Sequence, residues 1–232
     1  MQVLLTIIVL FGAFQLGLSV PVVTQSSEAA TVSELITANG QAERINMLND
    51  SDFVFDFFHP LADAVSSTGP DGHVIAAKLD NFPVLVGEGI AMSIGYLGPC
   101  GLNTPHFHPR ATEFNFVVNG TARAGMLQEN GVRVVLNDLS PGQATIFPRG
   151  SIHFEQNLGC EPLIFVAAFS SEDPGTTSLA NNFFRLPSDV VLATLGAYNI
   201  GQDVEHAEME IPTSVAFGVQ ECLQRCGITQ TS

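Results

Sequence analysis

Basic residues are scarce in this sequence. Lys and Arg total 8 against 23 Asp and Glu, which gives a formal net charge of -15 at pH 7 over 232 residues. A surface with this charge repels nucleic acid and anionic lipid, so we expect no nucleic-acid partner, and it keeps an exported protein soluble. With 46% apolar residues, the chain is long enough for one complete hydrophobic core and short of the length at which two independent cores are common.

Long apolar runs are absent except at the N-terminus. The run in MQVLLTIIVLFGAFQLGLSVPVV is interrupted by Gly12, Gln15 and Gly17, which leaves it shorter than the roughly 20 residues that a membrane span needs. The small residues that follow suit cleavage after Ser19. We therefore predict a signal peptide over residues 1–19 and a secreted protein of the extracellular space or cell wall, with a membrane anchor as the alternative.

Only four cysteines are present. In the oxidising compartment that export predicts, they are enough for two disulfides, and sequence leaves three pairings open. We favour Cys100 with Cys160 and Cys222 with Cys226. The second pair is the harder one to close, because helical geometry often holds sulfurs at i and i+4 too far apart for an unstrained bond.

Two sequons are acceptors for N-glycosylation in the same compartment, Asn49-Asp50-Ser51 and Asn119-Gly120-Thr121. The second has another explanation. Asn-Gly is the preferred tight turn of a β-hairpin, so Asn119 needs no glycan to account for it.

Long helical patterns are missing from the middle of the chain. From about Asp52 to Phe169, short runs of Val, Ile, Phe and Leu alternate with turn residues, at the intervals of roughly eight to twelve residues that are typical of antiparallel sandwiches and barrels. The lack of intervening helices argues against parallel βαβ units. We predict an all-β domain over residues 51–175, after an N-terminal extension with helical patches over residues 20–50.

Residues 176–232 change to helical spacing, in SLANNFFRL, PSDVVLATLGAYN and PTSVAFGVQECLQRCG. Pro187 or Ser188 and the stretch Pro212 to Ser214 are the expected helix starts. Gly227 is the expected stop. We predict a helical C-terminal segment.

The stretch PHFHPRATE carries the first chemical signal. His106 and His108 are two residues apart, so both imidazoles lie on one face of a strand. Glu113 would lie on the opposite face of an uninterrupted strand, but Pro109 breaks the strand and lets Glu113 open a new one that faces the same way. Downstream, the turn residues PRG precede His153, which begins the next strand. Three imidazoles and one carboxylate suit Mn, Fe, Ni, Cu or Zn rather than Ca or a thiolate-bound metal, and an octahedral shell leaves two positions for a substrate.

The two halves together resemble the paired motifs of the cupin superfamily. The first motif is met by His106, His108, Glu113 and Gly120, and the second by Gly142, Pro148, Gly150, His153 and Asn157. PHFHPRATE with FPRGSIHFEQN looks like the germins and germin-like proteins, and GPCGLNTPHFHPRATE with FSSEDPG is closer to the spherulin-like secreted cupins. The resemblance implies a jelly-roll β-barrel, Mn²⁺ held by the two motifs' three histidines and glutamate, and a C-terminal helical part that joins subunits into trimers or hexamers.

Candidate substrate residues come from the same resemblance. In germins with oxalate oxidase activity, two asparagines near the metal hold the substrate; one is matched by Asn103 and the other aligns with Ser93. Asn115 and Glu155 share strand parity with the ligands just before them, so both are candidates for the barrel interior. Glu155 is a candidate proton donor or base, but we favour a hydrogen bond that orients a ligand. For Asn115 we favour a buried amide satisfied by backbone.

The remaining polar residues near the motifs have plain alternatives. Arg110 and Arg149 either steer an anion such as superoxide or a dicarboxylate, or form structural ion pairs. His59, His73 and His206 lie outside both motifs, and we interpret them as surface or structural residues.

Three classes of function fit these features. The first is a manganese oxidoreductase, resembling superoxide dismutase or oxalate oxidase, that acts on superoxide or a small carboxylate. The second is a non-catalytic extracellular structural protein of a wall, spore or cyst. The third is a module that binds a small ligand or sugar. All three use the predicted metal site, so metal content followed by turnover assays is the observation that separates them.

Overall fold

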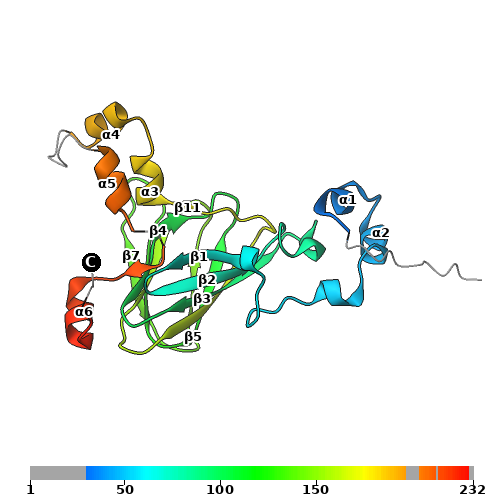
Figure 1. The fold of residues 1–232 in the computed structure, drawn as a ribbon, viewed down its shortest axis with the longest axis horizontal. Helices are drawn as coiled ribbons and strands as arrows, with labels where there is room; N and C mark the ends of the chain where they lie inside the picture. The colour runs from blue at the N-terminus through cyan, green and yellow to red at the C-terminus, as the bar shows by residue number, and fades with distance from the viewer. Residues whose placement is uncertain (1–29, 197–203, 213, 230–232) are drawn as a thin grey trace, which may run out of the picture.

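The computed structural model describes residues 30–196, 204–212 and 214–229. The predicted signal peptide, residues 1–19, lies outside the described residues. Two β-sheets pack face to face at the centre, with small helical parts at opposite ends (Figure 1). None of the helices in the described part of the chain has the length and apolar content that crossing a membrane requires.

Both sheets are antiparallel, as predicted. The first has the order β1 (Val65–Gly69), β2 (Gly72–Ala77), β3 (Ala91–Leu97), β10 (Leu163–Phe169), β5 (Glu113–Asn119), β8 (Ala144–Phe147). The second has the order β11 (Thr177–Ser178), β4 (Gly101–Phe107), β9 (Ile152–Asn157), β6 (Ala122–Leu127), β7 (Val135–Leu139), and β12 (Ala216–Phe217) also pairs with β4. The fold is a jelly-roll β-barrel.

Side-chain alternation separates the inside of the barrel from the outside. In β5 the residues alternate between buried and exposed from Glu113 to Val117, so Glu113, Asn115 and Val117 face inward. In β10 the inward residues include Leu163 and Phe165, which are almost fully buried in the main core cluster. The interior is therefore apolar around Val117 and Phe165 and polar around Glu113 and Asn115.

The turns of both motifs cross from one sheet to the other. The chain leaves β4 after Phe107 and enters β5 at Glu113, so Pro109 does break the strand as predicted. Asn119-Gly120 is a turn, with Gly120 at φ +85°, but it is not the hairpin turn that its sequence favours, because β5 pairs with β10 and β8 whereas β6 belongs to the other sheet. These crossings let strands from both sheets face one interior.

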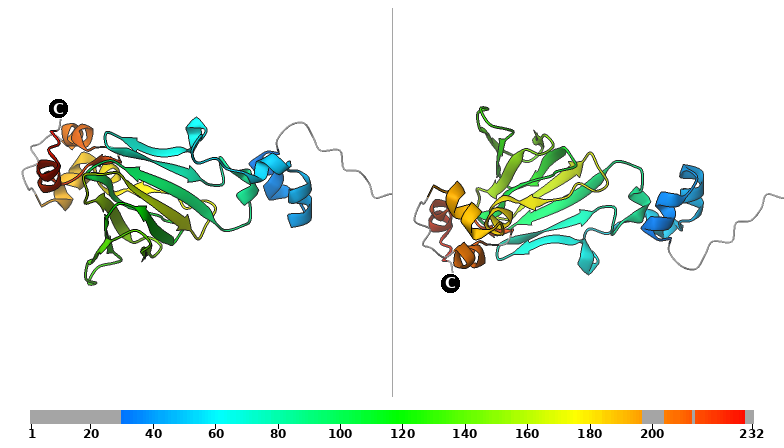
Figure 2. Two further views of the ribbon diagram at one scale, coloured as in Figure 1. Left: turned by 90° about the horizontal axis from the view of Figure 1, so that it is seen from below. Right: turned by 90° about the horizontal axis from the view of Figure 1, so that it is seen from above.

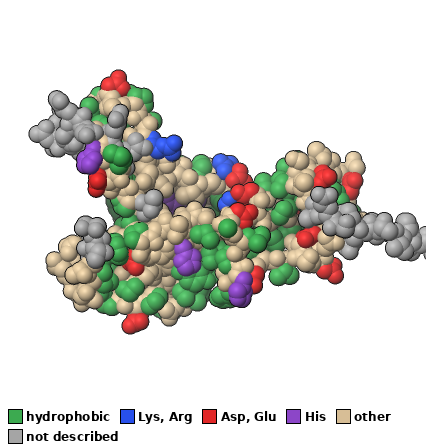
Figure 3. Space-filling model, viewed as in Figure 1, with side chains coloured by type: hydrophobic (Ala, Val, Ile, Leu, Met, Phe, Trp, Pro, Cys, Tyr) green, Lys and Arg blue, Asp and Glu red, His purple; other side chains and the backbone are tan. Residues whose placement is uncertain are grey.

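The N-terminal extension forms a small helical unit at one end of the barrel. It contains α1 (Val32–Thr37), α2 (Gln41–Asn46) and the short 3-10 turn η1 (Asp50–Phe53). Leu35, Leu48 and Val86 form a cluster separate from the barrel core, and the unit stands beside the barrel in both views of Figure 2. Two further short turns, η2 (Ala62–Ala64) and η3 (Pro83–Leu85), flank the first strands. Acidic side chains outnumber basic ones on the face shown in Figure 3, as the composition requires.

The C-terminal segment is helical, as predicted, with one difference. Its helices are α3 (Leu179–Phe184), α4 (Ser188–Thr194), α5 (Val204–Glu210) and α6 (Gln220–Cys226). The predicted start at Ser188 and stop at Gly227, which adopts φ +67°, are confirmed. The predicted start at Pro212 to Ser214 is wrong, because the apolar residues just after it form β12 against the edge of β4 and the helix begins only at Gln220.

The favoured disulfide pairing is also wrong. Cys100 bonds Cys222 and Cys160 bonds Cys226, with Cα–Cα distances of 5.7 and 5.3 Å. The reason is geometric: Cys222 and Cys226 lie one turn apart on α6, and each meets a different barrel loop, before β4 and after β9. The two disulfides therefore fasten α6 to the barrel.

Candidate metal centre

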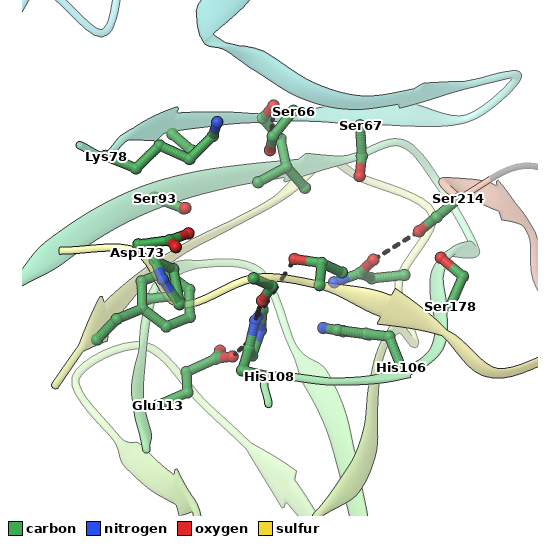
Figure 4. Close-up of a pocket in the computed structure, with 18 of the residues that line it drawn as sticks. Ser66, Ser67, Lys78, Ser93, His106, His108, Glu113, Asp173, Ser178 and Ser214 are labelled. Carbon is green, nitrogen blue, oxygen red and sulfur yellow. Dashed lines mark hydrogen bonds and ion pairs between the residues drawn. The ribbon is translucent and has the colours of Figure 1, made fainter. Parts of the chain in front are cut away.

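The structure brings together the four residues that the two motifs predict as ligands. His106 lies on β4 and His108 just after it, Glu113 opens β5, and His153 lies on β9. Each is at most 6% exposed, and one potential ligand atom from each lies within 4.8 Å of those of the other three. Figure 4 shows His106, His108 and Glu113 turned toward a common space.

Backbone carbonyl groups fix the orientation of all three imidazole rings. His106 and His153 each place Nδ1 against the carbonyl oxygen of the residue two positions earlier, at 2.8 and 2.9 Å, and His108 places Nδ1 against the Gly175 carbonyl. Since a carbonyl only accepts hydrogen bonds, each Nδ1 carries a proton, which leaves Nε2 as the nitrogen that would bind a metal. This is the arrangement that orients histidine ligands in metal sites.

Aromatic packing holds two of these rings from the side. Phe147 stacks on His153 with centroids 4.3 Å apart, and Phe169 meets His108 edge-on at 4.7 Å. Neither phenyl group carries a polar atom that could compete for a ligand position. The imidazole rings of His153 and His108 are therefore fixed in position before a metal binds.

Glu113 lies between two imidazoles. Its Oε2 is 3.1 Å from Nε2 of both His108 and His153. Burial alone would raise the pKa of Glu113, but hydrogen bonds from His108 and His153, together with their charges, outweigh burial and hold the pKa of this carboxyl below its usual range. Glu113 therefore stays ionised and supplies the negative charge that a cation needs here.

His106 is held neutral. Burial, followed by the neighbouring charges of His153 and His108, lowers the pKa of His106 to about 3. A metal ligand must be deprotonated, so a histidine that is already neutral gives up no proton when a cation binds. Three imidazoles and one ionised carboxylate, all buried, fit a divalent transition metal.

A second layer of polar side chains supports Glu113. Asn115 donates through Nδ2 to Glu113 Oε1 at 3.0 Å and to Glu155 Oε1 at 3.2 Å. Its amide is therefore satisfied by carboxylates, and the expectation of backbone partners is wrong. Asn103 Nδ2 donates to Glu155 Oε2 at 2.9 Å. Burial, and then the charge of Glu113, raises the pKa of Glu155 well above its ordinary value.

A cavity of about 300 Å³ opens beside the centre. Asn103 and Ser93 line it with the three residues His106, His108 and Glu113, whereas Asn115 and Glu155 lie behind its wall. The other lining residues come mainly from β1 and β2, β10 and the C-terminal segment: Asp63, Ser66, Ser67, Val74, Ala76, Lys78, Phe165, Ala167, Phe169, Asp173, Pro174, Gly175, Thr176, Ser178, Ser214. No motif marks the hydroxyl-bearing residues in this list, so sequence reasoning missed them.

The other polar residues singled out in the sequence take surface or structural positions. Arg110 pairs with Asp173 at the surface, Nη2 to Oδ1 at 2.6 Å, which agrees with the ion-pair interpretation. Arg149 is exposed and does not line the cavity. The other three histidines lie away from the centre: His59 contacts Asp56, His73 stacks on Tyr96, and His206 is exposed on α5.

Comparison with known proteins gives a consistent result. The family model described as Cupin matches residues 58–199. Spherulin-1B of Physarum polycephalum is 43% identical over 207 residues, covering 89% of this chain and 82% of that protein. Germin-like protein 5-1 of Oryza sativa subsp. japonica is 35% identical over 171 residues, covering 73% and 75%.

Solved structures agree with the sequence relatives. Recombinant oxalate oxidase in complex with glycolate superimposes with a TM-score of 0.59 at 26% identity, covering 70% of this chain and 84% of that one. Oxalate decarboxylase from Bacillus subtilis shares the fold with a TM-score of 0.59 at 22% identity, covering 73% and 45%. The chain therefore belongs to the cupin family, among its germin-like and spherulin-like members.

Proposed function

We propose that this protein is a secreted manganese cupin that binds a small carboxylate beside its metal and oxidises it, with dioxygen as the co-substrate that takes up the electrons. The observation that carries the proposal is the buried group His106, His108, Glu113 and His153, which faces a cavity of about 300 Å³. A purely structural metal site would be closed on all sides. A cavity at the metal leaves space for a ligand.

The metal would be held by the three Nε2 atoms and the Glu113 carboxylate. When bound, it supplies a Lewis acid and a redox centre at the positions that the protein leaves open. The rest of the site is the protein's own contribution. Asn103 offers an amide to a bound carboxylate, while Phe165 and Phe169 keep part of the cavity wall apolar and exclude water.

Lys78 supplies a positive charge at the cavity. Its side chain lines the cavity and contacts Asp80, which is mostly exposed, and Figure 4 shows it near Ser93. Because Lys78 is paired with Asp80, and Asp63 and Asp173 line the same cavity, the charge that would draw in an anion is mainly that of a divalent cation held by the three histidines and Glu113. This supports a carboxylate or superoxide as substrate. Secretion, N-glycosylation and assembly into trimers or hexamers belong to the same proposal.

The test is metal content followed by turnover. Wild-type protein and His153→Ala are expressed by the same secretory route, and bound metals are measured by mass spectrometry. We expect about one Mn²⁺ per chain in the wild type and at least a tenfold loss in the variant. His73→Ala, which removes a histidine outside the centre, is the matched control and should keep its metal.

Oxalate, glycolate and superoxide are then offered to the loaded protein. Turnover of oxalate or glycolate by the wild type, with loss of that turnover in His153→Ala, supports the proposal. Turnover of superoxide alone would show that superoxide, and not a carboxylate, is the substrate. A full metal load without turnover on any of the three would favour the non-catalytic structural or binding role. Absence of bound metal together with weak Mn²⁺ affinity would contradict the site itself.

A further inference from the structure

The last part of the chain completes the wall of the metal cavity. We call residues 214–226 the C-terminal arm. Ala216 and Phe217 of this arm pair with β4, and Val215 is fully buried in the barrel core. Gly69 of β1 permits this close fit, because a Cβ atom there would lie 1.7 Å from the Val215 carbonyl oxygen. The arm is therefore seated in the barrel, and Ser214 is held at its start.

Ser214 bonds directly to a candidate substrate residue. Its Oγ donates to Asn103 Oδ1 at 2.7 Å, and both side chains line the cavity. Figure 4 shows Ser214 at the side of the cavity where His106 lies. The other end of the same amide is also fixed, since Asn103 Nδ2 donates to Glu155 Oε2. The carboxamide is clamped at both ends.

The clamp decides which polar atoms Asn103 presents. A carboxamide has an acceptor oxygen and a nitrogen with two donor hydrogens. Ser214 engages the oxygen and Glu155 engages one N–H, so the second N–H is the donor left for a ligand. A site of this kind prefers a ligand oxygen that only accepts hydrogen bonds, as in a carboxylate, over a ligand group that must donate.

We propose that Ser214 is a positioning residue that fixes the Asn103 carboxamide and thereby selects anionic oxygen ligands at the metal. Without the hydroxyl group, Asn103 Oδ1 loses its donor and the carboxamide is held at one end alone, through Glu155 Oε2, so its second N–H is directed less firmly at the ligand. The inference rests on the proposed function, since it names a specificity device of the same site. It does not require that Ser214 touch the substrate.

The test uses the Mn²⁺-loaded full chain and two ligands that differ in charge. Glycolate and its neutral amide, glycolamide, are titrated by calorimetry against wild type, Ser214→Ala, Ser214→Thr, Asn103→Ala and the double variant Ser214→Ala/Asn103→Ala. We expect Ser214→Ala to weaken glycolate binding about five- to tenfold, the value of one lost hydrogen bond, and to change glycolamide binding less. Ser214→Thr keeps the hydroxyl and should restore the preference.

The double variant separates positioning from direct contact. If Ser214 acts through Asn103, removing both should weaken glycolate no more than Asn103→Ala alone. Additive losses, or equal losses for both ligands, would overturn the inference. Unchanged glycolate binding in Ser214→Ala would do the same while leaving the proposed function standing. A metal-loaded wild type that binds neither ligand would overturn the proposed function, and the inference with it. The Mn²⁺ EPR spectra of the ligand-free proteins should coincide, which checks that each variant keeps the metal centre intact.

Discussion

The carboxyl group of Asp71 destabilises the folded protein when it is charged. Asp71 lies in the turn between β1 and β2 and packs against the loop before β4. The packing is so close that a Cβ atom added to Gly98 would lie 2.1 Å from Asp71 Oδ1. Its Oδ2 is buried without a hydrogen-bond partner in the described part of the chain. Burial raises the pKa of Asp71 to about 6, so the charged form is disfavoured in the folded protein.

We expect Asp71→Asn to stabilise the protein above pH 6. Folding raises the pKa of the Asp71 carboxyl from 3.8 to about 6, so the protonated side chain contributes stability at a pH below 3.8. That contribution is lost as the pH rises through about 6. The asparagine side chain is uncharged at every pH, so the variant does not lose this stability. After allowance for the partial exposure of the group, the gain at pH 7.5 should be about 1 kcal/mol. Thermal unfolding of both proteins from pH 4 to 7.5 should show their difference growing with pH, and a difference of the same size at both ends would contradict this explanation.

At the scale of residues, the sequence predicted the side chains that recur at a fixed spacing. His106 at the end of β4 and His108 just after it are both buried, and Glu113 follows a proline break, so local rules suffice for three of the four candidate ligands. Ser214 could not be found in this way. It reaches Asn103 from 111 positions away, and a lone serine carries no pattern that distinguishes it from a surface residue.

The helix α6 is the element that the sequence placed least well. Helical spacing predicted that it exists and where it ends, but not that it docks on the barrel through two different loops. Pairing depends on which loops lie beside the helix in space, and neither the cysteine count nor the spacing contains that information. The sulfurs gather closely, with Cys100 Sγ 3.6 Å from Cys226 Sγ.

We expect removal of either disulfide to destabilise the protein strongly. Cys160→Ser/Cys226→Ser opens a bridge with a sequence separation of 66, and Cys100→Ser/Cys222→Ser one with a separation of 122. Loops of this length predict losses of about 3–5 kcal/mol, the larger for the longer loop. Urea unfolding without reductant measures them. Peptide mapping of the unreduced wild type is the check on connectivity, and a peptide that joins Cys100 to Cys160 would show the pairing to be wrong.

At the scale of the whole molecule, the outer surface of the first sheet is unusually apolar for a protein of this charge. Phe114 is 55% exposed and lies opposite Ile146, which is 52% exposed, on the neighbouring strand. Phe116 and Val118 continue along β5, and Met92 lies on the same sheet. The alternation that places Glu113 and Asn115 inside necessarily places the phenylalanines outside. A contiguous apolar surface of this kind is typical of a protein–protein interface.

We expect this surface to be buried between copies of the chain in solution. Phe114→Asp/Phe116→Asp would place two charges in the interface, where they lose water without gaining partners, and should lower the mass measured by light scattering toward that of one chain. Val134→Asp is the matched control, because Val134 is 58% exposed just before β7 of the other sheet. A monomeric wild type would contradict this prediction. So would an assembly that dissociates in Val134→Asp but stays intact in Phe114→Asp/Phe116→Asp. The outer and inner faces of β5 belong to one strand, so the metal content of the dissociated variant also shows whether the metal centre requires assembly. The candidate ligands contact one another within a single chain. We therefore expect the dissociated variant to keep its metal.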